Sequence, residues 1–339
     1  MQLTFGVEIE FLVRYRVSDY EPSCAGGEGK FFAPSRYLTR SRQLGGVIRA
    51  NIITILQEAG FDTNDVLDKT DYAKWTVDSD GSIECPPESG DFAYYGIEVK
   101  SPACCFSPWA LTQLQKVVVL INSKFEVFVN ESCALHVHVG NRHDGFPLQT
   151  LKNFSMLTAV FERQFNMLRP LHRLQNAFAE TVASQFPHMS SFDRVRRINA
   201  FRTQQDLIDC YHVRKDGIIS GYMAYNFKNL ATTRPFKTIE FRQHEGCMEP
   251  KAIARWTYLT IALVKVANDI GARGFTQLAF NHGNDSNYNI INLLRDLNLG
   301  DMADYYQQRG IYTHPRLRWE WAGSQEERRT DQQAAEDSD

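Results

Sequence analysis

The chain has 339 residues, of which 43% are hydrophobic, enough to bury a substantial core in one large domain or two small ones. The net charge of -3 at pH 7 is close to balance and argues against a nucleic-acid partner. The chain opens without a basic or apolar leader and holds no stretch able to span a bilayer, so we expect a cytoplasmic protein without a membrane partner. The 7 cysteines lack the paired spacing of a zinc site or a disulfide framework.

The first predicted element is a strand over residues 3–12, where β-forming residues partly alternate with polar ones. A stretch rich in Gly and Arg over residues 18–46 then predicts a long loop, of the length that often serves as a lid. Strand patterns recur over residues 74–84, 94–100, 134–140, 221–229 and 237–244. Apolar residues at helical spacing predict helices over residues 47–59, 108–128, 148–168, 191–211 and 250–270.

The order of these elements predicts the fold class. Strands and helices mix without a strict βαβ repeat, which favours an α+β domain with a largely antiparallel sheet over a doubly wound fold. We expect a single domain over residues 1–322. The remaining residues, 323–339, are polar and charged without apolar periodicity, and they predict a disordered tail.

Four of the predicted strands place two ionisable residues two positions apart, which puts both on one face because the side-chain period of a strand is two. The pairs are Glu8 and Glu10, Glu98 and Lys100, His136 and His138, and Glu240 and Arg242. The solvated face of an ordinary antiparallel sheet would alternate too, but it usually also carries Lys, Thr and Gln. A face of Glu, His and Arg instead matches the ligands of a hard cation and of phosphate.

The segments around these pairs resemble the signature blocks of the amidoligase family. They cover residues 5–11, 96–102, 135–140 and 238–246, in the order that the family shows, and they span most of residues 1–270. The resemblance extends more distantly to glutamine synthetase and glutamate–cysteine ligase. It implies a curved antiparallel sheet of the glutamine-synthetase catalytic type, with helices packed on its outer face and with ATP and Mg²⁺ or Mn²⁺ as cofactors.

The resemblance also implies roles for particular residues. Two cation sites would be built on Glu8 and on Glu10, with Glu98 joining one of them and His136 and Glu240 joining the other. His138 and Arg242 would face the ATP phosphates and, together with Glu240, carry the catalysis.

Two further segments resemble the family less closely. The turn over residues 78–84 resembles an aspartate-plus-serine turn of the family, which would bring Asp80, Ser82 or Glu84 to the cations; an ordinary acidic turn fits the sequence equally well. Asn226 resembles a family asparagine that lies near the nucleotide. A capping or ladder-bonding asparagine is the alternative.

The activity implied is that of an ATP-dependent carboxylate–amine ligase. The substrate carboxylate would attack the γ-phosphate to give an acyl phosphate, and an amine would then displace phosphate to form an amide or isopeptide bond. The motifs do not identify the acid or the amine, which could belong to a small molecule, a peptide or a protein side chain, since variable loops recognise substrates.

Four alternatives stay open at the level of sequence. A zinc hydrolase could use His136 and His138, because His-x-His on a strand is a common metal motif. A thiol hydrolase could use Cys104, Cys105 or Cys133 as its nucleophile. A phosphagen kinase of related fold would phosphorylate a guanidine, and a non-catalytic relative would bind nucleotide without turnover.

Overall fold

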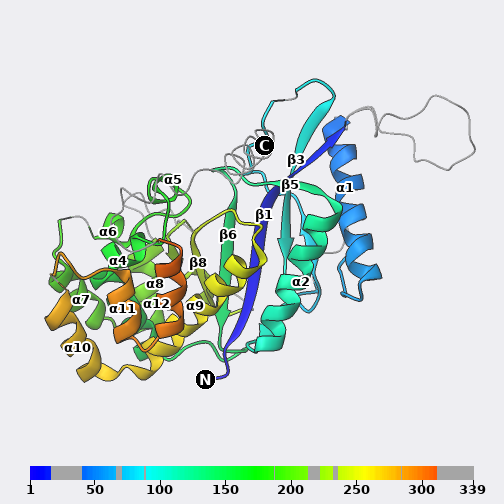
Figure 1. Ribbon diagram of the computed structural model, residues 1–339. Helices are drawn as coiled ribbons and strands as arrows, with labels where there is room; N and C mark the ends of the chain where they lie inside the picture. The colour runs from blue at the N-terminus through cyan, green and yellow to red at the C-terminus, as the bar shows by residue number, and fades with distance from the viewer. Residues whose placement is uncertain are drawn as a thin grey trace, which may run out of the picture.

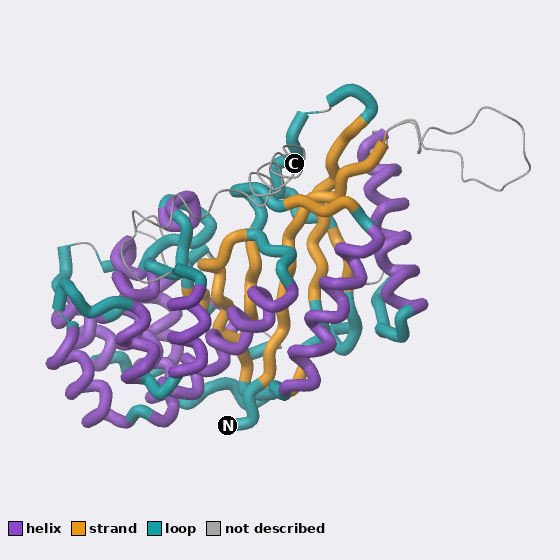
Figure 2. Tube along the Cα trace, viewed as in Figure 1, coloured by secondary structure: helices purple, strands orange, loops and turns teal. Residues whose placement is uncertain are grey.

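The computed structural model describes residues 1–16, 40–65, 71–87, 89–186, 188–212, 222–231, 236–283 and 285–310. Within these ranges one sheet carries helices on one of its faces (Figures 1 and 2). Its strands run in the order β2-β3-β1-β6-β8-β7, and every neighbouring pair is antiparallel. The α+β class and the antiparallel sheet predicted from the sequence are confirmed.

The strands have these bounds: β1 (Thr4–Arg16), β2 (Thr76–Asp78), β3 (Phe92–Lys100), β4 (Cys104–Cys105), β5 (Glu126–Phe128), β6 (Ala134–Gly140), β7 (Tyr225–Asn226) and β8 (Thr238–Glu245). The long β1 organises the sheet. It pairs with β3 and β4 along one edge and with β6 and β5 along the other. Four later strands are therefore aligned on β1.

The alternation along β1 separates the two faces of the sheet. Phe5, Val7 and Ile9 are buried in the main hydrophobic core. The intervening Glu8 and Glu10 belong to the opposite face, because successive side chains of a strand point to opposite sides. The apolar face is covered by helices, and the charged face holds the residues that the sequence singles out.

The helical layer follows the sheet from edge to edge (Figure 1). α1 (Arg40–Glu58) packs on β2 and β3, α2 (Pro108–Lys124) on β5, and α9 (Pro250–Asp269) on β1 and β6. α3 (Leu148–Val160) packs on α9, and its Phe154 ring contacts Tyr225 and Phe241 edge-on beneath β7 and β8. The strands that carry the charged residues thus have a buried apolar support.

The remaining helices gather beyond α3, on the β7 side of the sheet (Figure 1). They are α4 (Glu162–Asn166), α5 (Leu171–Leu174), α6 (Val182–Gln185), α7 (Ser191–Asn199), α8 (Gln204–His212), η2 (Lys228–Leu230), α10 (Gly271–His282), α11 (Ile290–Asp296) and α12 (Gly300–Gln308). No helix in the described ranges is long and apolar enough to cross a membrane.

Two predicted element ends are wrong for local reasons. The strand expected over residues 74–84 is reduced to β2, because the Asp80 carboxylate accepts hydrogen bonds from the Ser82 N–H and hydroxyl and so closes a turn. The helix expected over residues 108–128 ends at Lys124. The following residues instead form β5, which extends the ladder along β1.

Two predicted helices are each divided. The helix expected over residues 148–168 is interrupted at Phe161 between α3 and α4. The one expected over residues 191–211 is divided into α7 and α8, where the Asp206 carboxylate accepts from the N–H groups of Arg202 and Thr203. A capping carboxylate starts a new helix where apolar spacing alone suggests continuity.

Three other expectations concern loops and ends. The strand expected over residues 221–229 is β7 followed by the short helix η2 in the part that is described. Residues 40–46 of the expected loop 18–46 belong to α1, which begins earlier than predicted. Residues 18–39 and the tail 323–339 lie outside the described residues, and the single domain over 1–322 stays a prediction.

Candidate functional site

The strand register brings the ionisable pairs together on one face. Glu10 lies directly opposite Glu98 on β3, and Glu8 lies opposite His136 on β6. His138 in turn lies opposite Glu240 on β8. Directly opposite residues have Cβ atoms about 4.5–5.5 Å apart, so four strands concentrate their charges in a small area.

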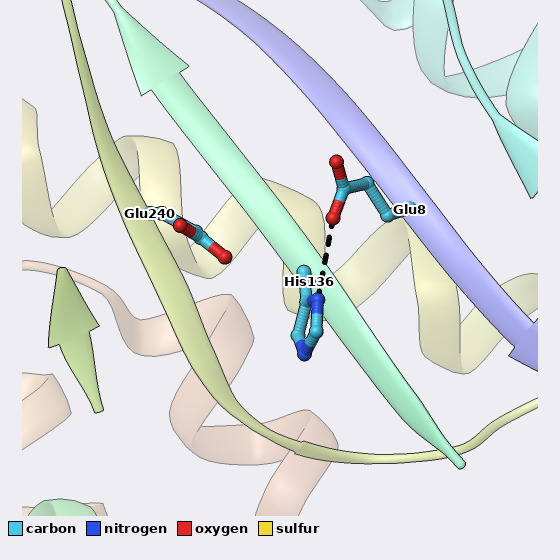
Figure 3. A group of neighbouring side chains, drawn as sticks. All are labelled: Glu8, His136 and Glu240. Atoms are coloured by element: carbon cyan, nitrogen blue, oxygen red, sulfur yellow. Dashed lines mark hydrogen bonds and ion pairs between the residues drawn. The ribbon is translucent and has the colours of Figure 1, made fainter. Parts of the chain in front are cut away.

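One group of potential metal ligands consists of Glu8, His136 and Glu240, from three adjacent strands (Figure 3). One ligand atom from each lies within 4.8 Å of the others. The Nδ1 atom of His136 is 3.3 Å from the Glu8 carboxylate. Carboxylate oxygen together with imidazole nitrogen is a donor set that suits divalent cations. We call this group the Glu8 cluster.

A second group, which we call the Glu10 cluster, consists of Glu10, Asp80 and Glu98, whose ligand atoms also lie within 4.8 Å of one another. Asp80 comes from the turn after β2 and the other two from β1 and β3. The Glu10 carboxylate accepts a hydrogen bond of 2.8 Å from the backbone N–H of Ala134, which fixes its orientation. Three carboxylates without a nitrogen donor suit Mg²⁺ or Mn²⁺.

The Glu10 cluster repels itself when it holds no cation. Burial, helped by the neighbouring Glu98 and Asp80 charges, raises the pKa of Glu10 to about 8. Burial and the Glu8 charge raise the pKa of Glu98 to about 7, although the Lys100 ammonium lies 2.8 Å from its carboxylate. A bound cation would displace these protons and relieve the repulsion.

The Glu8 cluster is balanced differently, because cations of the protein surround it. Burial alone would raise the pKa values of Glu8 and Glu240. His138 and His136 together outweigh burial at Glu8, and they do so at Glu240 with the help of Arg242, so both pKa values are lowered. Burial would lower the pKa of His138, yet the same two carboxylates raise it to about 9. Burial lowers the pKa of His136, which keeps that ring neutral and able to bind a metal.

Asn226 and Arg242 hold the Glu240 carboxylate from two sides. The Asn226 amide donates to one oxygen at 2.7 Å, and Nη1 of Arg242 donates to the other. Nε of Arg242 also donates to the carbonyl of Phe178 at 3.0 Å. The side-chain Oδ1 of Asn226 accepts from the Lys228 N–H, which closes a local turn before η2, whose N-terminal cap is Phe227. Contact of Asn226 with a nucleotide stays a prediction.

A pocket of about 220 Å³ lies at one end of the clusters, and we call it the Arg173 pocket. Glu10, His136 and Arg242 line it from the sheet. Glu84, predicted from sequence as a metal ligand, lies on its wall, exposed and outside both clusters. Arg173 from α5 also lines it, and no sequence motif indicates that residue, because its helix has four residues and no apolar period.

Two of the alternative activities lose support from this geometry. Burial raises the pKa of the Cys133 thiol to about 12 and also raises the pKa of Cys104, which keeps both thiols protonated. Of the two histidines proposed for zinc, the described clusters include only His136. His138 has a pKa of about 9 and is a cation at neutral pH.

Residues 1–264 match the family described as "Putative amidoligase enzyme". The chain therefore belongs to the amidoligase family. The resemblance seen in the four sequence blocks is confirmed.

Two other comparisons add little. No curated protein matches the chain. A solved structure described as "Apo GmaS without ligand" aligns at 13% sequence identity and a TM-score of 0.31, over 90% of this chain and 65% of that one. The chain thus spans less than two thirds of that protein, and we base no mechanistic argument on a likeness of this size.

Proposed function

We propose that this protein is an ATP-dependent carboxylate–amine ligase that forms an amide bond through an acyl-phosphate intermediate, with Mg²⁺ or Mn²⁺ as the metal. The observation that carries the proposal is the pair of neighbouring clusters on one sheet face of an amidoligase chain. Two cations side by side, with protein cations at their margin, suit the transfer of a phosphoryl group.

The residues present fit two divalent cations. Glu8, His136 and Glu240 would hold one, and Glu10, Asp80 and Glu98 would hold the other. When bound, the cations would neutralise the nucleotide phosphates and the charge that develops during phosphoryl transfer. The buried carboxylates, which repel one another without metal, favour this reading over a solvated acidic surface.

Protein cations beside the Glu8 cluster would serve the phosphates directly. His138 is protonated at neutral pH, and its Nε2 forms an ion pair with the Glu8 carboxylate at 3.4 Å. The Arg242 guanidinium is fixed by Glu240 and by the Phe178 carbonyl. Both groups are held in place before the reaction, so neither would need to reorganise when charge develops.

The reaction balances without a protein nucleophile. An oxygen of the substrate carboxylate bonds to the γ-phosphorus of ATP as the bond to the ADP oxygen breaks. The amine nitrogen then bonds to the acyl carbon, phosphate leaves, and the nitrogen loses a proton. The sheet residues position the reactants and neutralise charge, which is how proteins accelerate phosphoryl transfer.

Substitution of three site residues tests the proposal. Glu8→Gln, Glu240→Gln and Arg242→Ala should each lower ATP turnover by roughly 100-fold or more, measured as ADP release with a panel of carboxylic acids and hydroxylamine as the amine. Glu126→Gln is the matched control, because Glu126 pairs with Arg14 at the exposed edge of the sheet. Wild-type turnover in all three site variants would refute the proposal, and a phosphorylated guanidine product would indicate a kinase.

A further inference from the structure

Arg173 is a buried cation that forms no close ion pair with a described carboxylate. Its side chain is only 1% exposed. Among the described residues its guanidinium makes one hydrogen bond, from Nη2 to the carbonyl of Arg242 at 2.5 Å. Its Nε is buried and has no acceptor, and no described carboxylate lies within 4.0 Å of it.

Burying a guanidinium without a paired anion costs free energy, and a bound anion would offset that cost. A guanidinium presents five N–H donors in a planar fork, and buried charges in proteins are normally paired. Burial lowers the pKa of Arg173 to about 10, so the group is still charged at neutral pH. The charges of Glu10 and Glu245 favour the ionised guanidinium, but neither carboxylate lies within ion-pair distance of it. Among the described residues the fork donates only to one backbone carbonyl, which leaves most of it free for a ligand.

The position of Arg173 is fixed by bonds that tie its segment to β8. Arg173 donates to the Arg242 carbonyl, and Arg242 donates back to the carbonyl of Phe178. Arg169 donates to the carbonyls of Arg173 and Ala179 at 2.5 and 2.6 Å. These hydrogen bonds tie residues 169–179 to one another and to β8. They hold the guanidinium in one orientation before any ligand arrives.

The pocket that Arg173 lines indicates the kind of anion. Glu10 belongs both to this pocket and to the Glu10 cluster. Arg242 also lines the pocket, and it is one of the residues proposed above to contact the phosphates. Its volume of about 220 Å³ is below the roughly 300–1,000 Å³ typical of sites for drug-sized ligands, so it suits a small acid better than a nucleotide. An acid held here would lie beside the place where its carboxylate must meet the γ-phosphate.

We propose that the Arg173 pocket binds the acid substrate and that the Arg173 guanidinium recognises its carboxylate through the planar fork. This inference rests on the proposed ligase function and adds to it the substrate-binding end of the site. It assigns the pocket to a small carboxylic acid. The walls formed by Ser82 and Asn176 offer hydroxyl and amide groups to the rest of that molecule.

The test compares an acid with its uncharged analogue on protein loaded with Mg²⁺ and the non-hydrolysable ATP analogue AMPPCP. The probes are succinate and glutarate against succinamide and glutaramide, each at 20 mM, and the readout is the melting temperature, which rises when a ligand binds the native state. We expect at least one acid, and neither diamide, to raise the melting temperature of the wild-type protein. Arg173→Met should abolish this acid preference while the shift caused by Mg²⁺ and AMPPCP remains.

Two further variants make the test decisive. Arg163→Met removes a guanidinium that also donates to backbone carbonyls, those of Asp285 and Ser286, but lies outside the pocket, so acid preference should persist. Arg173→Lys keeps the charge and loses the fork, so we expect acid binding about ten-fold weaker. If Arg173→Met does not fold, Arg173→Lys decides the matter.

The outcomes separate this inference from the proposed function. Equal acid preference in the wild type and in Arg173→Met, or wild-type acid affinity in Arg173→Lys, would overturn the Arg173 assignment. So would the absence of any acid response in wild-type protein that does respond to Mg²⁺ and AMPPCP. A wild-type protein that ignores the nucleotide would instead contradict the ligase proposal itself.

Discussion

At the scale of single residues, similar carboxyl groups a few ångströms apart have different charge states. Glu8 and Glu240 stay ionised because His138 and His136, with Arg242 at Glu240, together compensate for their burial. At Glu10 and Glu98 burial and neighbouring carboxylates prevail, even though Lys100 pairs with Glu98, and they raise the pKa values to about 8 and about 7. The two clusters should therefore respond differently to pH and to metal, which gives each a distinct experimental signature.

The charge state of Glu10 predicts a pH-dependent stability difference. A folded pKa of about 8, above the usual glutamate value of 4.5, means that the native state binds more protons than the unfolded state between these values. Its stabilising contribution is therefore complete below pH 4.5 and is lost as the pH rises through 8. Glu10→Gln mimics the protonated form and escapes this loss.

Urea unfolding in EDTA should therefore show the two proteins nearly equal at pH 5, with Glu10→Gln more stable at pH 9 by on the order of 3 kcal/mol. The other titrating groups are common to both proteins, so their contributions largely cancel in the difference. A gap that is the same at pH 5 and pH 9 would contradict the raised pKa.

Asn226 predicts a second effect at this scale, through the ligand that it orients. Asn226→Ala removes the 2.7 Å hydrogen bond to Glu240, and loss of such an outer partner typically weakens metal binding 10–100-fold. Mn²⁺ titration by calorimetry measures this directly. Asn64→Ala is the control, since Asn64 is equally buried, at 5% exposure, and bonds to Thr76 and Asp71 away from Glu240; equal Mn²⁺ affinity in the two variants would contradict this role.

At the scale of elements, the site depends on β7 and β8 being held by the helix beneath them. The ring of Phe154 on α3 is fully buried and contacts Tyr225, Phe227 and Phe241 edge-on. Tyr225 and Phe241 are each adjacent in sequence to a residue of the site, Asn226 and Glu240. Packing on the apolar face thus sets the positions of charged groups on the other.

Phe154→Ala should accordingly destabilise the protein by about 3–5 kcal/mol, the usual cost of removing a large buried ring, as measured by urea unfolding. Phe280→Ala is the control, because Phe280 on α10 is 87% exposed and its loss should change stability by less than about 0.5 kcal/mol. Comparable losses in the two variants would show that the Phe154 ring is not a support of the sheet.

Element patterns were predictable from sequence where the period was unambiguous. The alternation predicts the bounds of β6 and the charged face of both β1 and β6, since each strand is apolar on one side. β1 itself continues to Arg16, past the end predicted at residue 12. Element ends were less predictable, because single hydrogen bonds decide them. The Asp80 carboxylate closes a turn, and the Asp206 carboxylate caps the start of α8. The spacing of apolar residues in the sequence indicates neither hydrogen bond.

At the scale of the whole molecule, strand register brings the ionisable pairs of separate strands together in one site. The sequence indicates that Glu8 and Glu240 each belong to a charged face, but 232 positions separate them in the chain and only the strand order places them on either side of His136. The family could be recognised because its motifs lie on strands. Arg173 could not be predicted as a site residue, because it lies on a four-residue helix that has no apolar period.

The central claim is that the two clusters form a nucleotide and metal site, and thermal stability with ligands tests it most directly. The melting temperature would be measured with Mg²⁺ alone, AMPPCP alone, both together, and Zn²⁺ alone. We predict a rise of several degrees that requires Mg²⁺ and nucleotide together, because each cation would bind protein carboxylates and phosphates at once. No response to that combination, with a clear response to Zn²⁺ alone, would contradict the ligase site and favour a zinc hydrolase.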